Sequence, residues 1–105
     1  MFASISNHPS RNWSRDQLDA AQTIGGEIRD FPFPPVPPQA DSNEIDRLAD
    51  ELLQIVLVET PLAALVQGEF VLTYRLVSRL MALGIPCYAT ASHREDYEFV
   101  QFRKY

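Results

Sequence analysis

The sequence predicts one α/β domain in which helices cover both faces of a mainly parallel sheet. Two observations predict this fold class. Strand-like runs alternate with helix-like segments in the order βαβαβαββ, which is typical of parallel βαβ units. The chain has 105 residues, 46% of them hydrophobic. That length suits one domain over residues 1–105 and hardly two.

The first strand is expected over residues 1–6, a short run that is apolar and partly β-branched. A helix should follow over residues 14–24. Ser14 can cap its start while Gln17 reaches back to the cap, because Ser-x-x-Gln is a capping-box pattern. Two glycines at 25–26 then end the helix.

Residues 27–33 alternate loosely and predict the second strand, and the prolines between 32 and 38 predict an extended segment. The next helix is capped within residues 41–44. Residues 62–66 form an unbroken apolar run, as expected of a buried parallel strand. The apolar stripe that predicts the helix consists of Ile45, Leu48, Ala49, Leu52, Leu53 and Val56.

The third helix is expected over residues 70–83, where apolar side chains cover roughly 200° of the circumference. We expect one face to pack on the sheet and the other to meet a second copy of the chain. Strands follow over residues 85–91 and 97–105, and a link of about five residues makes them an antiparallel hairpin. One helix face carries Leu72, Leu76, Leu80 and Leu83, and the other carries Phe70, Tyr74, Val77 and Met81.

Right-handed crossovers then give the sheet order 2-1-3-4-5, which is a three-layer, Rossmann-like arrangement. Turns after parallel strands emerge at one edge of such a sheet, where ligands bind. Four short segments fall there, at residues 7–10, 31–34, 67–70 and 90–94, and three of them carry polar side chains. A folding requirement alone does not ask for these side chains, so we expect them to form one site.

The first segment contains two candidates for chemistry, His8 and Ser10, together with Asn7 and Pro9 as candidate binding residues. His8 could act as a general acid–base, or be a half-buried histidine with no such role. Ser10 could donate to a phosphate, or hydrogen-bond the local backbone. Trp13 could stack on a base, although packing is its more common use.

The later segments offer the strongest phosphate candidate. Arg94 can pair bidentately with phosphate oxygens, or lie solvated at a hairpin bend. Gln67 and Gly68 lead into a helix N-terminus that favours an anion, whereas Glu69 would repel a phosphate and could instead cap that terminus. The remaining candidates after the fourth strand are Thr90, Ser92 and His93.

Composition excludes several function classes. A net charge of −5 and a pI near 4.8 argue against general coating of DNA or RNA, while one small anionic ligand remains compatible. Cys87 is the only cysteine, which indicates a reducing, cytoplasmic setting, and the two histidines match no zinc pattern. We therefore expect no metal and no cofactor. No signal peptide or bilayer-spanning run is recognisable.

The familiar nucleotide and hydrolase motifs are missing. The chain has no G-x-G-x-x-G, no P-loop and no G-x-S-x-G. Their absence argues against a dinucleotide oxidoreductase, a P-loop NTPase and an α/β-hydrolase.

A set of short motifs resembles small CRISPR-associated Rossmann-like proteins, some of which are ring nucleases of antiviral defence. The likeness covers most of the chain and is most specific in Ser-Asn-His-Pro-Ser at 6–10 and Val-Gln-Gly-Glu-Phe at 66–70. It also includes Trp13-Ser14, Gln17, Ala20-Ala21, Asp30-Phe31-Pro32-Phe33-Pro34 and the C-terminal residues 99–105.

The resemblance implies a CARF-like (CRISPR-associated Rossmann fold) homodimer that binds a cyclic oligoadenylate, such as cyclic tetra-adenylate, across its two-fold axis. It implies metal-independent cleavage, in which a ribose 2′-OH attacks the neighbouring phosphate. Ser10 and Gln67 would position the reacting groups, Arg94 would stabilise charge and His8 would act as the acid. The acidic composition and Glu69 depart from a simple anion trap. A non-catalytic sensor or sponge and a structural interaction subunit are the alternatives.

Overall fold

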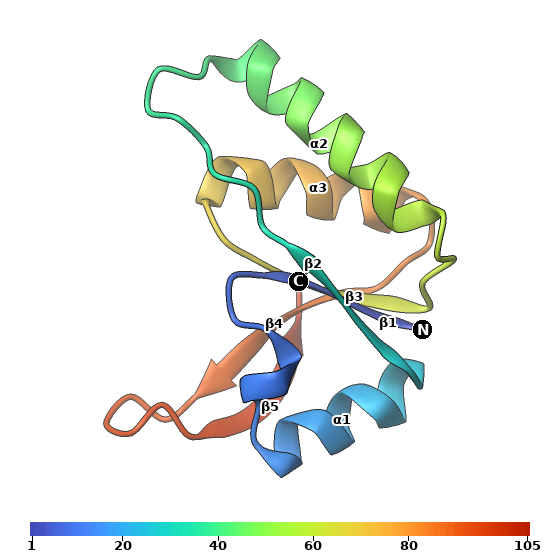
Figure 1. Cartoon of the computed structure of the whole chain (residues 1–105), viewed down its shortest axis with the longest axis vertical. Helices are drawn as coiled ribbons and strands as arrows, with labels where there is room; N and C mark the ends of the chain where they lie inside the picture. The colour runs from blue at the N-terminus through green and yellow to red at the C-terminus, as the bar shows by residue number, and fades with distance from the viewer.

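The computed structural model describes all residues from Met1 to Tyr105 and contains one five-stranded sheet in the order β2-β1-β3-β4-β5 (Figure 1). The first four strands run parallel and β5 pairs antiparallel with β4, which confirms the predicted fold class and sheet order. The strands are β1 Phe2–Ser6, β2 Ile28–Pro32, β3 Ala63–Gln67, β4 Cys87–Ser92 and β5 Phe99–Lys104.

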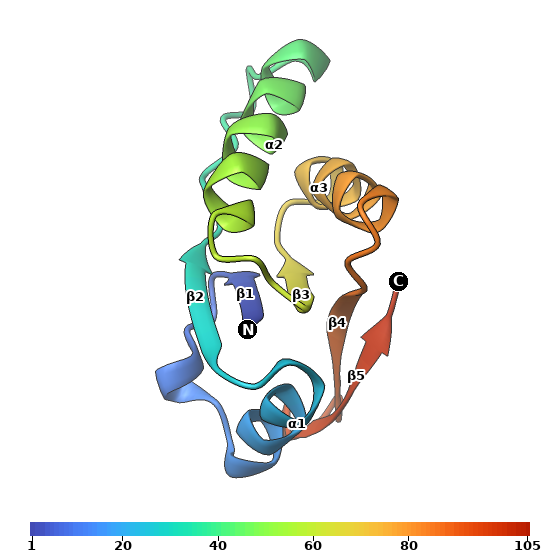
Figure 2. The ribbon, with the colours of Figure 1, turned by 90° about the vertical axis from the view of Figure 1, so that its right-hand side faces the viewer.

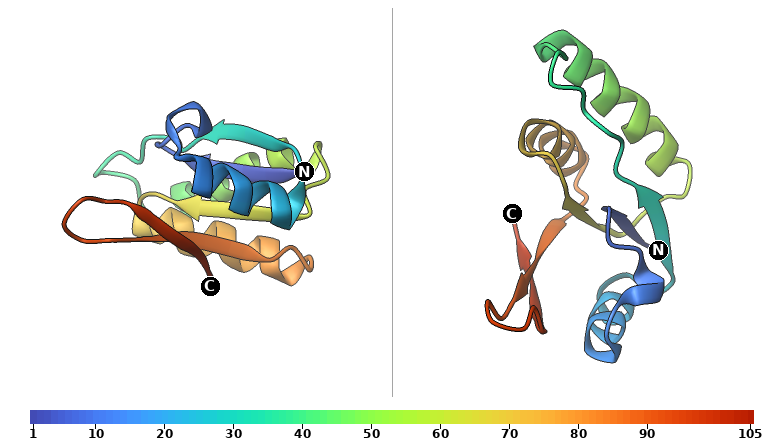
Figure 3. Two further views of the ribbon diagram at one scale, coloured as in Figure 1. Left: turned by 90° about the horizontal axis from the view of Figure 1, so that it is seen from below. Right: turned by 60° about the vertical axis from the view of Figure 1, so that its left-hand side comes forward.

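The helices lie on both sides of this sheet, as Figure 2 shows. Helices α2 (Ser42–Leu57) and α3 (Phe70–Ala82) cover one face, and α1 (Arg15–Gly25) lies on the other. A short 3₁₀ helix, η1 (Ser10–Asn12), follows β1 and was not predicted. Two further views show α1 beside β1 and β5, with the β4–β5 hairpin projecting from the body (Figure 3). No helix has both the length and the apolar character that crossing a membrane requires.

Helix α1 departs from its predicted details at both ends. Ser14 caps the helix by accepting a hydrogen bond from the Gln17 backbone N–H at 3.2 Å. The Gln17 side chain, however, does not reach back to the cap, because it points into the protein and is 6% exposed. The helix also continues through Gly25, where a Cβ atom would lie 2.8 Å from the Cβ of Phe2. Gly25 therefore allows α1 to pack directly on β1.

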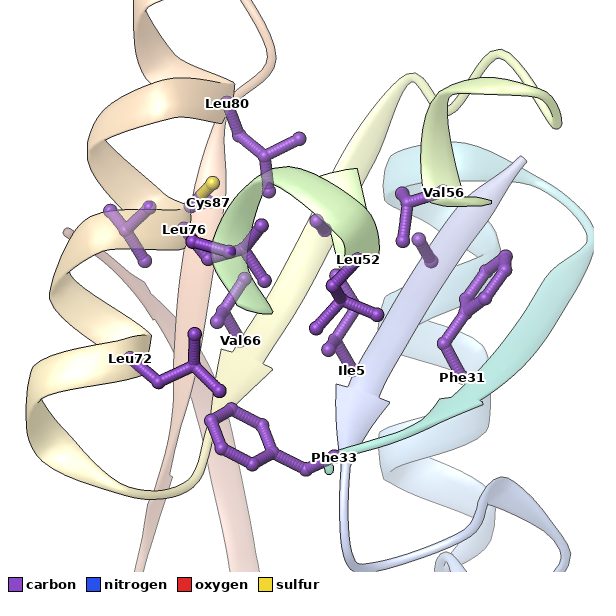
Figure 4. Packing of buried hydrophobic residues seen from close by; sticks show 14 of the residues in the cluster. Ile5, Phe31, Phe33, Leu52, Val56, Val66, Leu72, Leu76, Leu80 and Cys87 are labelled. Atoms are coloured by element: carbon purple, nitrogen blue, oxygen red, sulfur yellow. The ribbon is translucent and has the colours of Figure 1, made fainter. Parts of the chain in front are cut away.

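The larger core lies between the sheet and the pair α2 and α3, and Figure 4 shows its side chains. Ile5 and Val66 project from the centre of the sheet toward these helices, and Leu52 and Leu76 pack on them. Two arginines of α3 pair with aspartates of α2: Arg75 Nε lies 2.7 Å from Asp46 and Arg79 Nε lies 2.8 Å from Asp50. Hydrogen bonding to Asp50 raises the pKa of Arg79.

Helix α3 buries one face and exposes the other. Leu72, Leu76 and Leu80 are fully buried, as predicted, and Val77 joins them. Leu83 follows the last helical residue and is 56% exposed, so the predicted stripe ends one turn early. Phe70, Tyr74 and Met81 remain exposed on the outer face.

A smaller, aromatic core lies on the α1 side of the sheet. Phe2 and Trp13 pack with Phe102 of β5, with ring centroids 5.2 and 6.1 Å from the Phe102 ring. Leu65 and Tyr88 extend the cluster toward the middle of the sheet. This cluster closes only part of the α1 face, and the polar site lies beyond it.

The sheet opens between β3 and β4. These strands pair only at Ala64–Cys87 and Leu65–Tyr88, whereas β1 and β3 stay paired as far as Ser6–Gln67. Beyond Leu65 the backbone of β3 therefore has no strand partner on its β4 side. On the α3 side, the Tyr105 hydroxyl donates to the free Val66 carbonyl at 2.6 Å.

Candidate functional site

A pocket of about 360 Å³ lies at the carboxyl ends of β1, β3 and β4, on the side of the sheet that carries α1. This is the edge at which open α/β sheets bind ligands, at the point where the strand order reverses. The pocket is lined by Ser6, Asn7, His8, Trp13, Gln17, Leu65, Gln67, Thr90, Ser92 and Tyr97.

The structure brings together half of the candidate residues and leaves the other half outside. Six line the pocket: Asn7, His8, Trp13, Gln67, Thr90 and Ser92. Six do not: Pro9, Ser10, Gly68, Glu69, His93 and Arg94.

Gln67 bridges the gap between the diverging strands. Its Oε1 accepts hydrogen bonds from the Thr90 backbone N–H at 2.8 Å and from the Thr90 hydroxyl at 2.9 Å. The side chain thus replaces the missing backbone pairing and holds the end of β4 beside β3. Because Oε1 is fixed in this way, the Nε2 donor of Gln67 remains free for another acceptor.

Trp13 holds the segment after β1 in place. Its ring is 6% exposed, and its Nε1–H donates to the backbone carbonyl of His8 at 2.9 Å. The His8 backbone N–H in turn donates to Ser6 Oγ at 3.1 Å. These bonds fix the main chain of His8, while its imidazole stays exposed and forms no hydrogen bond within the protein.

Ser10 is held by a neighbouring carboxylate. Its Oγ–H donates to Asp30 Oδ2 at 2.6 Å, and its backbone N–H donates to Asp30 Oδ1 at 3.0 Å. Asp30 on β2 therefore accepts from both the N–H and the hydroxyl of Ser10, the two donors that could otherwise bind a phosphate at the start of η1. Pro9, as the residue that precedes η1, has no donor to add.

A second carboxylate occupies the start of α3. Glu69 Oε1 accepts from the Leu72 backbone N–H at 2.7 Å, which is the capping alternative expected from the sequence. Gly68 is required by packing, since a Cβ atom there would lie 2.5 Å from the ring of Phe33. Neither helix start at this edge is thus open to an anion.

The β4–β5 hairpin contributes Tyr97 to the pocket in place of the expected His93 and Arg94. His93 and Arg94 are exposed near its tip and line no part of the pocket, whereas Tyr97 does. Tyr97 is 83% exposed and has φ of 57°, a left-handed conformation that is uncommon for a residue with a side chain. As a result the pocket contains no lysine or arginine, and most of its lining side chains can form hydrogen bonds.

The sequence predicted a capping role for Gln17, whereas the structure places its side chain in the pocket. Its side chain is 6% exposed, lines the pocket, and has an Nε2 without a hydrogen-bond partner. An unsatisfied buried donor costs about 1–3 kcal/mol. The available signal was its spacing, because Gln17, Ala21 and Gly25 recur every four residues on the buried face of α1.

Two other kinds of chemistry find no support in the side-chain arrangement. No group of three or more His, Cys, Asp or Glu side chains is placed to hold a metal ion. Cys87 is 2% exposed, and burial raises the pKa of its thiol to about 11. The thiol is therefore protonated near neutral pH and lies in the core, where it cannot act as a nucleophile.

Comparison with known proteins places the chain in a family. Neither the curated proteins nor the solved structures contain a significant match to it. The model of the Uncharacterized protein MJ1673 family matches residues 1–103, which is nearly the whole chain. The chain therefore belongs to the Uncharacterized protein MJ1673 family.

Proposed function

We propose that the pocket binds a cyclic oligoadenylate, with cyclic tetra-adenylate as the first choice, and that a homodimer opens the ring without a metal. The observation that carries this proposal is the convergence of Asn7, His8, Gln67 and Thr90 at the switch point of a Rossmann-like sheet. The resemblance of residues 6–10 and 66–70 to CRISPR-associated Rossmann-like proteins supports the choice of ligand.

Ring opening needs little from the protein beyond alignment. The ribose 2′-hydroxyl loses its proton to solvent water and its oxygen forms a bond to phosphorus, as the bond from phosphorus to the leaving 5′-oxygen breaks. The products are a 2′,3′-cyclic phosphate and a 5′-hydroxyl. Holding these three atoms in line converts a rare encounter into a unimolecular step.

Two pocket residues can assist this step. The free Nε2–H of Gln67 can donate to a phosphate oxygen, because Thr90 fixes the other end of the carboxamide. The exposed His8 imidazole, on a main chain that Trp13 anchors, can give a proton to the leaving 5′-oxygen. Ser10 and Arg94 have no such role in this proposal, since Asp30 holds the first and the second lies outside the pocket.

The second candidate function is a sensor or sponge that binds the same ring without cutting it. The specific observation in its favour is that the pocket lining has no lysine or arginine. No such side chain lines the pocket to stabilise the negative charge that develops on the phosphate during attack. Binding and cleavage must therefore be measured separately.

Incubation of the protein with cyclic tri-, tetra- and hexa-adenylate in EDTA, followed by chromatography, tests the proposal. We expect one ring to be converted to linear products. The substitution His8→Ala should abolish conversion, and the matched control His93→Ala changes the only other histidine, which lies outside the pocket.

The remaining outcomes separate the alternatives. Intact rings together with a raised melting temperature would indicate a sensor, because a ligand that binds the native state stabilises it. Intact rings with no thermal shift would contradict both functions and leave a structural interaction subunit. Equal cleavage by the His8→Ala and His93→Ala variants would remove His8 from the mechanism.

A further inference from the structure

One buried group in the pocket is left without a partner. Gln17 enters the pocket from α1, is 6% exposed, and has an Nε2 that no protein atom satisfies. Buried polar side chains nearly always have a partner. Its neighbours along the buried face of the helix, Ala21 and Gly25, are small residues without polar side-chain groups. A carboxamide at this position is therefore explained best by a partner from outside the chain.

Two other buried side chains also have a polar atom without a partner, but neither of them lines the pocket. The Ser4 hydroxyl belongs to β1, two residues before Ser6, and makes no hydrogen bond to Gln17. The Thr73 hydroxyl belongs to α3 on the opposite face of the sheet. Of these three groups, only Gln17 lines the pocket.

The chemistry of the pocket narrows the class of ligand. A carboxamide presents one donor and one acceptor side by side, and in nucleic-acid recognition glutamine pairs in this bidentate way with the edge of adenine. Tyr97 stands at the rim with an 83% exposed ring that can stack on a planar ligand. The lining has no lysine or arginine, which suits the uncharged base of a nucleotide.

We propose that Gln17 and Tyr97 form a nucleobase subsite, in which the Gln17 carboxamide binds the donor–acceptor edge of an adenine and the Tyr97 ring stacks on its face. This inference rests on the proposed function, since the adenine is part of the proposed ring, and it names the part of that ring that enters the pocket. The Nε2 atom is buried in the structure, so the proposal requires the carboxamide to turn about its last torsion for Nε2 to reach the base.

Binding of adenosine tests the subsite without any phosphodiester. Trp13 is the only tryptophan and lines the pocket, so its fluorescence reports binding directly. We expect wild-type protein to bind adenosine in a titration to millimolar concentration, and to bind purine riboside, which lacks the exocyclic amine, at least ten-fold more weakly. Gln17→Leu should weaken adenosine binding at least ten-fold, and Tyr97→Ala should weaken it to a smaller extent.

Thermal unfolding distinguishes a lost contact from a damaged fold. Gln17→Leu removes a buried polar group that has no partner, so the free variant should melt at or above the wild-type temperature. Gln22→Leu is the matched control, because it makes the same change on an exposed position of the same helix. It should leave adenosine binding unchanged.

The outcomes also separate this inference from the proposed function. Adenosine binding that survives Gln17→Leu would overturn the role of Gln17. A melting temperature raised by cyclic tetra-adenylate with no binding of adenosine would overturn the subsite and leave the proposed function standing. Adenosine binding that depends on Gln17, with no effect of any cyclic oligoadenylate, would support the subsite and overturn the proposed ligand.

Discussion

The hydrogen bonds of Gln67 should determine whether the end of β4 stays beside β3. Replacing Gln67 with methionine keeps the length of the side chain and removes its acceptor oxygen, leaving Thr90 N–H and Oγ–H without their partner. A net hydrogen bond contributes about 1 kcal/mol, and both residues are partly exposed to water that can replace the lost acceptor. We therefore expect Gln67→Met to lower the free energy of unfolding by about 1–2 kcal/mol.

The matched control is Gln67→Glu. Only the Oε1 acceptor of Gln67 contacts Thr90, and a carboxylate oxygen can accept the same two hydrogen bonds. This variant should therefore stay within about 0.5 kcal/mol of wild type. Urea unfolding followed by circular dichroism measures both variants, with the m-value expected to be unchanged. Equal stability of all three proteins, or equal losses in the two variants, would refute this account of the gap between β3 and β4.

Three further changes test the packing, the buried thiol and the outer face of α3. Gly68→Ala should destabilise by about 1–3 kcal/mol, because its Cβ meets the Phe33 ring at 2.5 Å, and urea unfolding should find a smaller loss in a Phe33→Leu background. Burial raises the pKa of the Cys87 thiol from 9.0 to about 11, so the thiol loses its proton at a lower pH in the unfolded chain than in the folded protein. The free energy of unfolding should therefore fall as the pH rises from 9.0 to about 11, and it should fall less in the Cys87→Ala variant. Tyr74, 70% exposed on the outer face of α3, should lie in the proposed dimer interface. Light scattering should find a dimer of the wild-type chain and a monomer near 11.9 kDa for Tyr74→Glu, and a monomeric wild type would contradict the dimer.

The sheet order was predictable because it follows from local patterns and a handedness rule. Apolar periodicity marks α2 and α3, the unbroken run marks β3, and right-handed crossovers leave few ways to connect them. The short link before β5 makes an antiparallel hairpin the only geometry available. The edge at which the pocket forms follows from the same topology.

The residues within the site were predictable only in part, because their partners are distant in sequence. The Ser10–Asp30 contact depends on β2 lying beside β1, and no local pattern at Ser10 reveals it. The Ser-x-x-Gln pattern favours a capping role for Gln17, whereas the buried position of its side chain reflects how α1 packs on the sheet. The position of Arg94 outside the pocket depends on the direction of the hairpin, which sequence periodicity does not encode.

Residue-resolved NMR on the ¹⁵N-labelled protein tests the central claim that this pocket binds a cyclic oligoadenylate. Addition of cyclic tetra-adenylate should shift the backbone signals of Asn7 and Thr90 and the side-chain amide signals of Gln17 and Gln67. The signal of the Arg79 side chain, which pairs with Asp50 on the opposite face of the sheet, should stay in place. Unchanged spectra, or shifts confined to α2 and α3, would contradict the assignment of this pocket as the binding site.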